Sequence, residues 1–158
     1  MNNKITIWTN KYLFNGFKIA NYEELKDYVM RGDIYQISFL RCNKETLKKY
    51  INYLNKNYVS LDFLYITKSN IKILKNIDFC FINSMDLSYN NLISSNYKII
   101  INIVFSSYYD CHSLSFNLKL SYNKFNKFLP FNDKINKYII TKYIYIQYDN
   151  NPIKYKFK

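Results

Sequence analysis

Apolar positions in the first third of the chain recur with the period of an α-helix. A helix over 22–31 would place three apolar side chains on one face: Tyr22, Leu25 and Val29. Asn21 stands in the N-cap position with Glu24 three residues later, and Gly32 stands where a left-handed residue can end the helix. The pattern predicts one short amphipathic helix.

A second and stronger helical pattern follows Asn43, which is again a suitable N-cap. Its apolar positions are Leu47, Tyr50, Ile51, Leu54 and Tyr58. These positions follow the i, i+3, i+4, i+7, i+11 spacing of a single helical face. We expect a helix that begins at 44 and ends near 57.

After residue 58 the pattern changes to short runs of branched and aromatic residues, which are typical of strands. The runs are VSLDFLYI, DFCFI, KIIINIVF, SLSFNLKL and KYIYIQY. No Pro/Ser-rich linker separates the two parts. The sequence therefore predicts a single domain over 1–158, with helices mainly within 22–57 and a strand-rich part over 58–158.

Two strand-like windows resemble each other. Residues 85–92 read MDLSYNNL and residues 118–125 read LKLSYNKF. Four shared letters are expected by chance in a chain of this length and composition, so the spacing around them matters more. Both windows follow the frame apolar-x-apolar-x-x-Asn-x-apolar. The positions are Met85, Leu87, Asn90 and Leu92 in one, and Leu118, Leu120, Asn123 and Phe125 in the other.

This frame resembles the leucine-rich repeat family, whose core is L-x-L-x-x-N-x-L. The resemblance implies that the first two apolar residues of each copy point inward from a short strand. It also implies that the Asn side chain bonds to the backbone of adjoining turns. A longer copy with Ser in the Asn position starts 21 residues before Met85. Its positions are Leu64, Ile66, Ser69, Ile71, Leu74 and Ile77.

Three weaker copies extend the resemblance over most of the chain. They are Ile37, Phe39 and Cys42; Ile5, Ile7 and Asn10; and Ile144, Ile146 and Asp149. The implied ladder of polar or small side chains reads Asn10, Cys42, Ser69, Asn90, Asn123 and Asp149. The spacing is irregular, and its longest gap leaves room for one more strand at 99–105. The predicted fold class is α/β, a short irregular leucine-rich-repeat-like solenoid. The alternative is a compact α+β domain with a mainly antiparallel sheet.

Glycine and proline are scarce, with two of each, while 49% of residues are hydrophobic and 20% aromatic. This composition is that of a folded chain. Phosphate-binding loops and dinucleotide folds need glycine where the backbone approaches the ligand. We find neither fingerprint, and we expect no cofactor and no small-molecule substrate.

The formal net charge is +12, which suggests an anionic partner. From Leu118 to Lys158 there are nine basic and two acidic residues, so this end carries +7 of the total. An A- and T-rich coding sequence would also raise the Lys, Asn, Ile, Tyr and Phe content. The basic bias is therefore either functional or compositional.

The candidate catalytic residues are few. Cys42, Cys80 and Cys111 are widely spaced and odd in number, so neither a disulfide framework nor a metal site is indicated. His112 adjoins Cys111 and follows Asp110, with no second base nearby. Because acid–base catalysis needs a pair of tuned groups, we expect no enzyme activity. We see no signal peptide and no membrane span, and we expect a reducing cytoplasmic setting with no membrane partner.

On the repeat interpretation, several residues between the apolar positions face outward. They are Trp8, Arg41, Lys68, Tyr89, Lys119, Tyr122, Tyr145 and Tyr148. Aromatic rings mixed with cations suit RNA, because rings stack on bases and cations neutralise phosphates. The other interpretation is that these are half-buried strand residues. The terminal IKYKFK alternates, so as a strand it would place Lys154, Lys156 and Lys158 on one face.

Two functions follow from these observations. The first is a non-catalytic basic docking protein that binds a large ribonucleoprotein, namely the ribosome, through rRNA backbone and neighbouring proteins. The second is a leucine-rich-repeat adaptor for protein–protein interaction with no nucleic-acid role.

Overall fold

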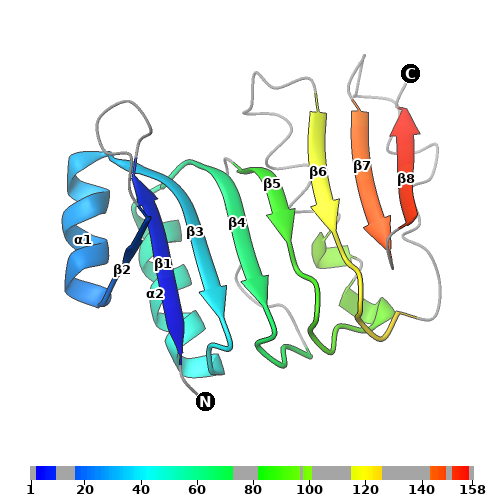
Figure 1. Ribbon diagram of the computed structural model, residues 1–158, viewed down its shortest axis with the longest axis horizontal. Helices are drawn as coiled ribbons and strands as arrows, with labels where there is room; N and C mark the ends of the chain where they lie inside the picture. Colours follow the sequence, from blue (N-terminus) through cyan, green and yellow to red (C-terminus); the bar gives the residue numbers. More distant parts are fainter. Residues whose placement is uncertain are drawn as a thin grey trace.

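One mixed β-sheet organises the chain, as the computed structural model shows (Figure 1). The structure describes residues 3–9, 17–72, 82–96, 98–100, 115–125, 143–148 and 151–156. Within these residues the sheet has eight strands in the order β2-β1-β3-β4-β5-β6-β7-β8. The strands are β1 (Lys4–Thr9), β2 (Phe17–Ile19), β3 (Ile34–Leu40), β4 (Leu61–Thr67), β5 (Ile82–Asp86), β6 (Ser115–Lys119), β7 (Tyr143–Tyr148) and β8 (Asn151–Lys156).

The centre of the sheet is parallel and its two edges are antiparallel. Strands β3 to β7 pair with one another in parallel and in chain order, so their carboxyl ends lie at one edge of the sheet. Strand β1 runs antiparallel to both β2 and β3, and β8 runs antiparallel to β7. The predicted α/β class is confirmed. The alternative with a mainly antiparallel sheet is wrong, because four of the seven described pairings are parallel.

Both predicted helices are present. Helix α1 spans Tyr22–Arg31, between the Asn21 N-cap and Gly32, which adopts a left-handed φ of 69°. The Asn21 side chain accepts a hydrogen bond from the Glu24 amide at 2.9 Å, as the spacing predicts. Helix α2 spans Lys44–Lys56, and its Asn43 cap accepts from the Thr46 amide at 2.8 Å.

The core lies between the helices and one face of the sheet. Figure 1 shows α2 behind β1 and β3, and the rings of Phe39 and Tyr50 meet edge to face across this layer. Leu25 of α1 and Leu54 of α2 are fully buried. Buried sheet residues include Ile5, Ile7, Ile37, Phe39, Leu61, Leu64, Ile66, Ile82, Met85 and Leu118. Burial of alternate residues along β3 and β4 leaves the other face of the sheet half-exposed.

The strand register agrees with the repeat frame at four strands. Ile37 pairs with Leu64, Leu64 with Met85, and Met85 with Leu118. These are the first apolar positions of four consecutive copies, so the copies are structurally equivalent.

The register departs from the frame at both ends. Ile146 of β7 pairs with Leu118, whereas the frame aligned Ile146 with Leu120. The predicted alignment of the copy ending at Asp149 is therefore shifted by two residues from the observed register. At the other end, Ile7 pairs antiparallel with Ile37. Equivalent stacked copies require parallel strands, so the copy that begins at Ile5 is also wrong.

The structure describes only residues 99 and 100 of the strand predicted at 99–105. These two residues are helical, together with residue 98, so the prediction is wrong at this point. A 3-10 turn, η1 (Ser94–Asn96), precedes them. Ile100 is 1% exposed and belongs to the main core. The strand preference of branched residues depends strongly on packing, and here burial on a helical turn overrides it.

Candidate functional site

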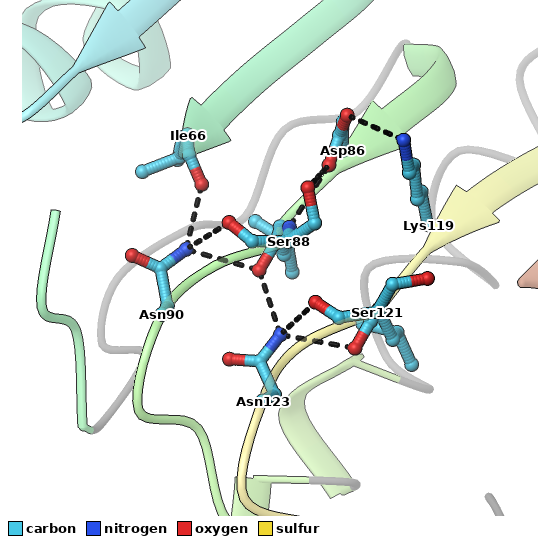
Figure 2. Close-up of polar contacts among 9 residues, drawn as sticks. Ile66, Asp86, Ser88, Asn90, Lys119, Ser121 and Asn123 are labelled. Carbon is cyan, nitrogen blue, oxygen red and sulfur yellow. Dashed lines mark hydrogen bonds and ion pairs between the residues drawn. The ribbon is translucent and has the colours of Figure 1, made fainter. Parts of the chain in front are cut away.

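Asn90 fastens the turn after β5 to the turn after β4 (Figure 2). Its amide nitrogen donates to the carbonyl oxygens of Ile66 at 2.7 Å, Leu87 at 3.0 Å and Ser88 at 3.3 Å. Its oxygen accepts from the Ser69 amide at 2.9 Å. Because Asn90 is buried, these bonds satisfy backbone groups that water does not reach.

Asn123 repeats this arrangement one strand further along the sheet. Its amide nitrogen donates to Leu87 oxygen at 2.9 Å, Leu120 oxygen at 3.1 Å and Ser121 oxygen at 3.4 Å. Its oxygen accepts from the Leu92 amide at 3.0 Å. Each Asn thus bonds to its own turn and to the preceding one, which is the role that the repeat frame predicted.

The ladder continues with smaller groups toward β3. The Ser69 hydroxyl donates to the Thr67 oxygen at 3.0 Å and accepts from the Cys42 amide at 3.1 Å. Asn10 and Asp149, the predicted ends of the ladder, lie outside the described residues. We use the name Asn ladder for Cys42, Ser69, Asn90 and Asn123.

The residue before each ladder position has a left-handed backbone. The φ angles are 53° at Arg41, 50° at Lys68, and 57° at both Tyr89 and Tyr122. Left-handed φ is uncommon for residues other than glycine, asparagine and aspartate. We call these four residues the turn row. All four side chains are exposed.

The turn row brings three of the predicted partner-binding residues together. The rings of Tyr89 and Tyr122 stack with centroids 4.3 Å apart and planes inclined by 14°. The Lys68 Nζ lies 5.3 Å from the Tyr89 ring centroid, within the range of a cation–π contact. Desolvation, the charge of Tyr122, a hydrogen bond with Tyr122 and the nearby Asp86 carboxylate raise the pKa of the Tyr89 hydroxyl.

The turns at the carboxyl ends of the parallel strands, which carry the turn row, are basic. Four described segments follow the parallel strands: 41–43, 68–72, 87–96 and 120–125. They contain four basic residues and no acidic one. The basic residues, all exposed, are Arg41, Lys68, Lys72 and Lys124. This edge would therefore attract a polyanion.

Lys119, another predicted contact residue, lies on the half-exposed sheet face beside Asp86. Its Nζ is 4.0 Å from the Asp86 carboxylate, as Figure 2 shows. The same carboxylate accepts hydrogen bonds from the Ser88 amide at 2.9 Å and the Ser88 hydroxyl at 2.5 Å. Asp86 therefore offsets part of the charge of Lys119, which contributes less to an anion surface than the turn row does.

The half-exposed sheet face also carries an aromatic cluster that the sequence analysis missed. The Phe63 ring stacks on Tyr65 with centroids 6.3 Å apart and meets Tyr35 edge-on at 5.8 Å. Burial and the nearby Asp86 raise the pKa of the Tyr65 hydroxyl. Strand alternation in LDFLYIT assigns Phe63 and Tyr65 to one face, and this signal could have identified the pair.

The remaining predicted contact residues that the structure describes lie on strands and not in the turns that carry the turn row. Trp8 pairs with Gln36 in the antiparallel part of the sheet. Tyr145 pairs with Lys154 between β7 and β8. Tyr148 and Lys156 lie at opposite ends of that same strand pair, opposite Asn151 and Tyr143 respectively. Lys158 lies outside the described residues.

A second cation–aromatic cluster joins the two helices. The Nζ atoms of Lys26 and Lys49 lie 4.9 and 4.0 Å from the Tyr22 ring centroid. Tyr22 also meets Tyr50 and Tyr53 edge-on. In the sequence, the i, i+4 spacing of Tyr22 and Lys26 indicated that these two side chains could be in contact on one face of a helix. Because Lys49, Tyr50 and Tyr53 of α2 contact Tyr22 of α1, this cluster stabilises the packing of the two helices.

The candidate catalytic residues Asp110, Cys111 and His112 lie outside the described residues. Burial raises the pKa of the Cys42 thiol to about 11, so this thiol stays protonated and unreactive near neutral pH. Within the described parts of the chain, no group of His, Cys, Asp and Glu side chains is arranged to hold a metal ion. No helix there has the length and apolar character to cross a membrane.

The chain matches no protein-family model, no curated protein and no solved structure.

Proposed function

We propose that this protein is a non-catalytic docking protein that binds a large ribonucleoprotein assembly in the cytoplasm. The ribosome is the assembly that we propose. Contacts to rRNA backbone and to neighbouring proteins would hold it in place. The observation that carries the proposal is the exposed turn row, which places two cations and two stacked rings in described turn segments that contain no acidic residue.

The backbone of the turn row strengthens this proposal. A left-handed residue other than glycine is destabilising by roughly 1–2 kcal/mol. Four such positions carry Arg, Lys, Tyr and Tyr, where Gly or Asn would be less strained. Strain of this kind is found at functional sites, held in place by surrounding bonds. The Asn ladder supplies those bonds.

We also propose that the chain is a short, irregular leucine-rich-repeat-like solenoid. Support comes from the four equivalent strands β3 to β6, their shared left-handed position and the Asn ladder between them. The solenoid is capped at the amino-terminal side by the antiparallel β1.

Co-sedimentation tests the proposed function. Purified protein is mixed with ribosomal particles at 50 mM and 300 mM KCl and centrifuged through sucrose. Electrostatic contact with phosphates predicts pelleting at low salt and release at high salt. If the protein stays in the supernatant at low salt, the proposal is wrong.

A protein–protein adaptor is the second candidate, and the Tyr35–Phe63–Tyr65 cluster favours it. Aromatic residues are enriched in protein interfaces. An adaptor would bind one protein with little dependence on salt and would not need rRNA. Salt-insensitive capture of a single protein after nuclease treatment would support the adaptor over the docking protein.

A further inference from the structure

Both faces of the Tyr89 ring are occupied. Lys68 comes from the turn after β4 and Tyr122 from the turn after β6, and these turns flank that of Tyr89. Lys68 Nζ lies 5.3 Å from the Tyr89 centroid, and the Tyr122 ring lies 4.3 Å away. Tyr89 therefore offers its edge to a partner, not its face.

A nucleobase cannot enter this stack without breaking it. A base between two rings would need their planes about 7 Å apart, twice the contact distance of about 3.5 Å. Adjacent strands hold the two backbone positions about 4.8 Å apart. The Asn ladder fixes this spacing at the turns themselves, through bonds from Asn90 and Asn123 to the preceding turn.

Beyond the ring faces that meet in the stack, the turn row presents ring edges, hydroxyl groups and positive charges. Tyr89 and Tyr122 are each 45% exposed, and the edge of an aromatic ring carries partial positive charge. The Tyr89 hydroxyl, whose pKa is raised by desolvation, is protonated at neutral pH. Lys68 adds a cation over the Tyr89 ring, and Arg41 adds an exposed cation on the neighbouring turn after β3.

This inference rests on the proposed function, namely that the partner is RNA. We infer that the turn row binds the sugar–phosphate backbone of single-stranded RNA, with the bases directed away from the stacked tyrosines. Arg41 and Lys68 neutralise phosphates, and the tyrosine edges and hydroxyls contact phosphate and ribose oxygens. Binding is consequently independent of sequence at this site.

An abasic ligand separates backbone binding from base stacking. The probe is a fluorescently labelled single-stranded RNA of mixed sequence, compared with an abasic RNA of equal length by fluorescence anisotropy. We expect the two dissociation constants to agree within about threefold, because each lost base stack would weaken binding by about fivefold or more. A tenfold or greater preference for ordinary RNA overturns the inference and leaves the proposed function intact. If neither ligand binds and the protein also fails to pellet with particles, the proposed function itself is wrong.

A conservative double variant tests the tyrosines. Tyr89→Phe with Tyr122→Phe keeps the ring stack and removes both hydroxyls, so the fold should be retained, as urea unfolding can verify. We expect affinity for ordinary and abasic RNA to fall equally, by about threefold to tenfold. The matched control is Tyr58→Phe, since Tyr58 is also left-handed and 77% exposed but lies at the other end of β4. If the double variant leaves both affinities unchanged, or weakens only ordinary RNA, the inference is wrong.

Discussion

At the scale of single residues, the most informative feature is the pairing of each ladder residue with the turn-row residue that precedes it. Asn90 satisfies buried backbone groups on two turns, while Tyr89 beside it is exposed and strained. The sequence frame predicted the bonding role of Asn90. It did not predict the left-handed φ of Tyr89, because a tyrosine carries no local signal for that conformation.

Replacing Asn90 with Ala tests the ladder. Buried carbonyl and amide groups on two turns would lose their partners, so we expect the free energy of unfolding to fall by about 2–4 kcal/mol. Urea denaturation monitored by circular dichroism measures this change. Asn52→Ala on the exposed side of α2 is the control and should stay within about 0.5 kcal/mol of wild type. Equal effects of the two substitutions would contradict the assignment.

The Cys42 thiol gives a test of burial. Its pKa is raised to about 11 by desolvation, so the reactive thiolate is scarce at pH 8 in the folded protein. In a variant with Cys80→Ser and Cys111→Ser, we expect slow labelling of Cys42 by a thiol reagent at pH 8. Labelling should become fast in urea, where unfolding exposes the thiol and returns its pKa to the ordinary range. Rapid labelling of the folded protein at pH 8 would show that Cys42 is accessible.

At the scale of elements, the helices were the most predictable part of the fold. Each has a helical period of apolar residues and an Asn cap, and both signals are local. The turn at 98–100 was not predictable in the same way. Its sequence favours a strand, and only packing of Ile100 into the core explains the helix.

The Asn43 cap can be tested separately from the rest of α2. Asn43→Ala removes the acceptor for the Thr46 amide and should destabilise the protein by about 1 kcal/mol, measured by thermal or urea unfolding. Asn43→Asp retains a capping oxygen, so it should stay close to wild type. If both variants lose the same stability, the cap is not the cause.

At the scale of the whole molecule, the parallel order of β3 to β7 brings residues from distant parts of the chain to one edge. Arg41, Lys68, Tyr89 and Tyr122 were all selected from the sequence as contact residues, and the structure gathers the last three into a stack. Trp8 and the lysines of β8 were selected on the same grounds but lie on other strands. A single sequence gives spacing within a copy, but it does not give strand order or direction, which depend on long-range packing.

The same architecture explains why net charge alone is a poor guide. The carboxyl-terminal part of the chain has the larger charge, yet the cations of the candidate surface come from three separate turns, those after β3, β4 and β6. Lys119 is basic but lies beside Asp86. Placement relative to acidic groups, and not the total of +12, identifies the candidate surface.

The salt dependence of RNA binding in two charge-matched variants tests the central claim most directly. Arg41→Asn with Lys68→Asn removes two turn-row cations and keeps residues that tolerate a left-handed backbone. Lys48→Asn with Lys56→Asn removes two exposed cations from α2. The measured quantity is the slope of the logarithm of the binding constant against the logarithm of salt concentration, for single-stranded RNA.

We predict that the turn-row variant reduces the magnitude of this slope by about 1.4, or about 0.7 for each lost phosphate contact. The α2 variant should leave the slope unchanged. If the two variants reduce the slope equally, RNA responds only to total charge, and the turn row is not the binding site.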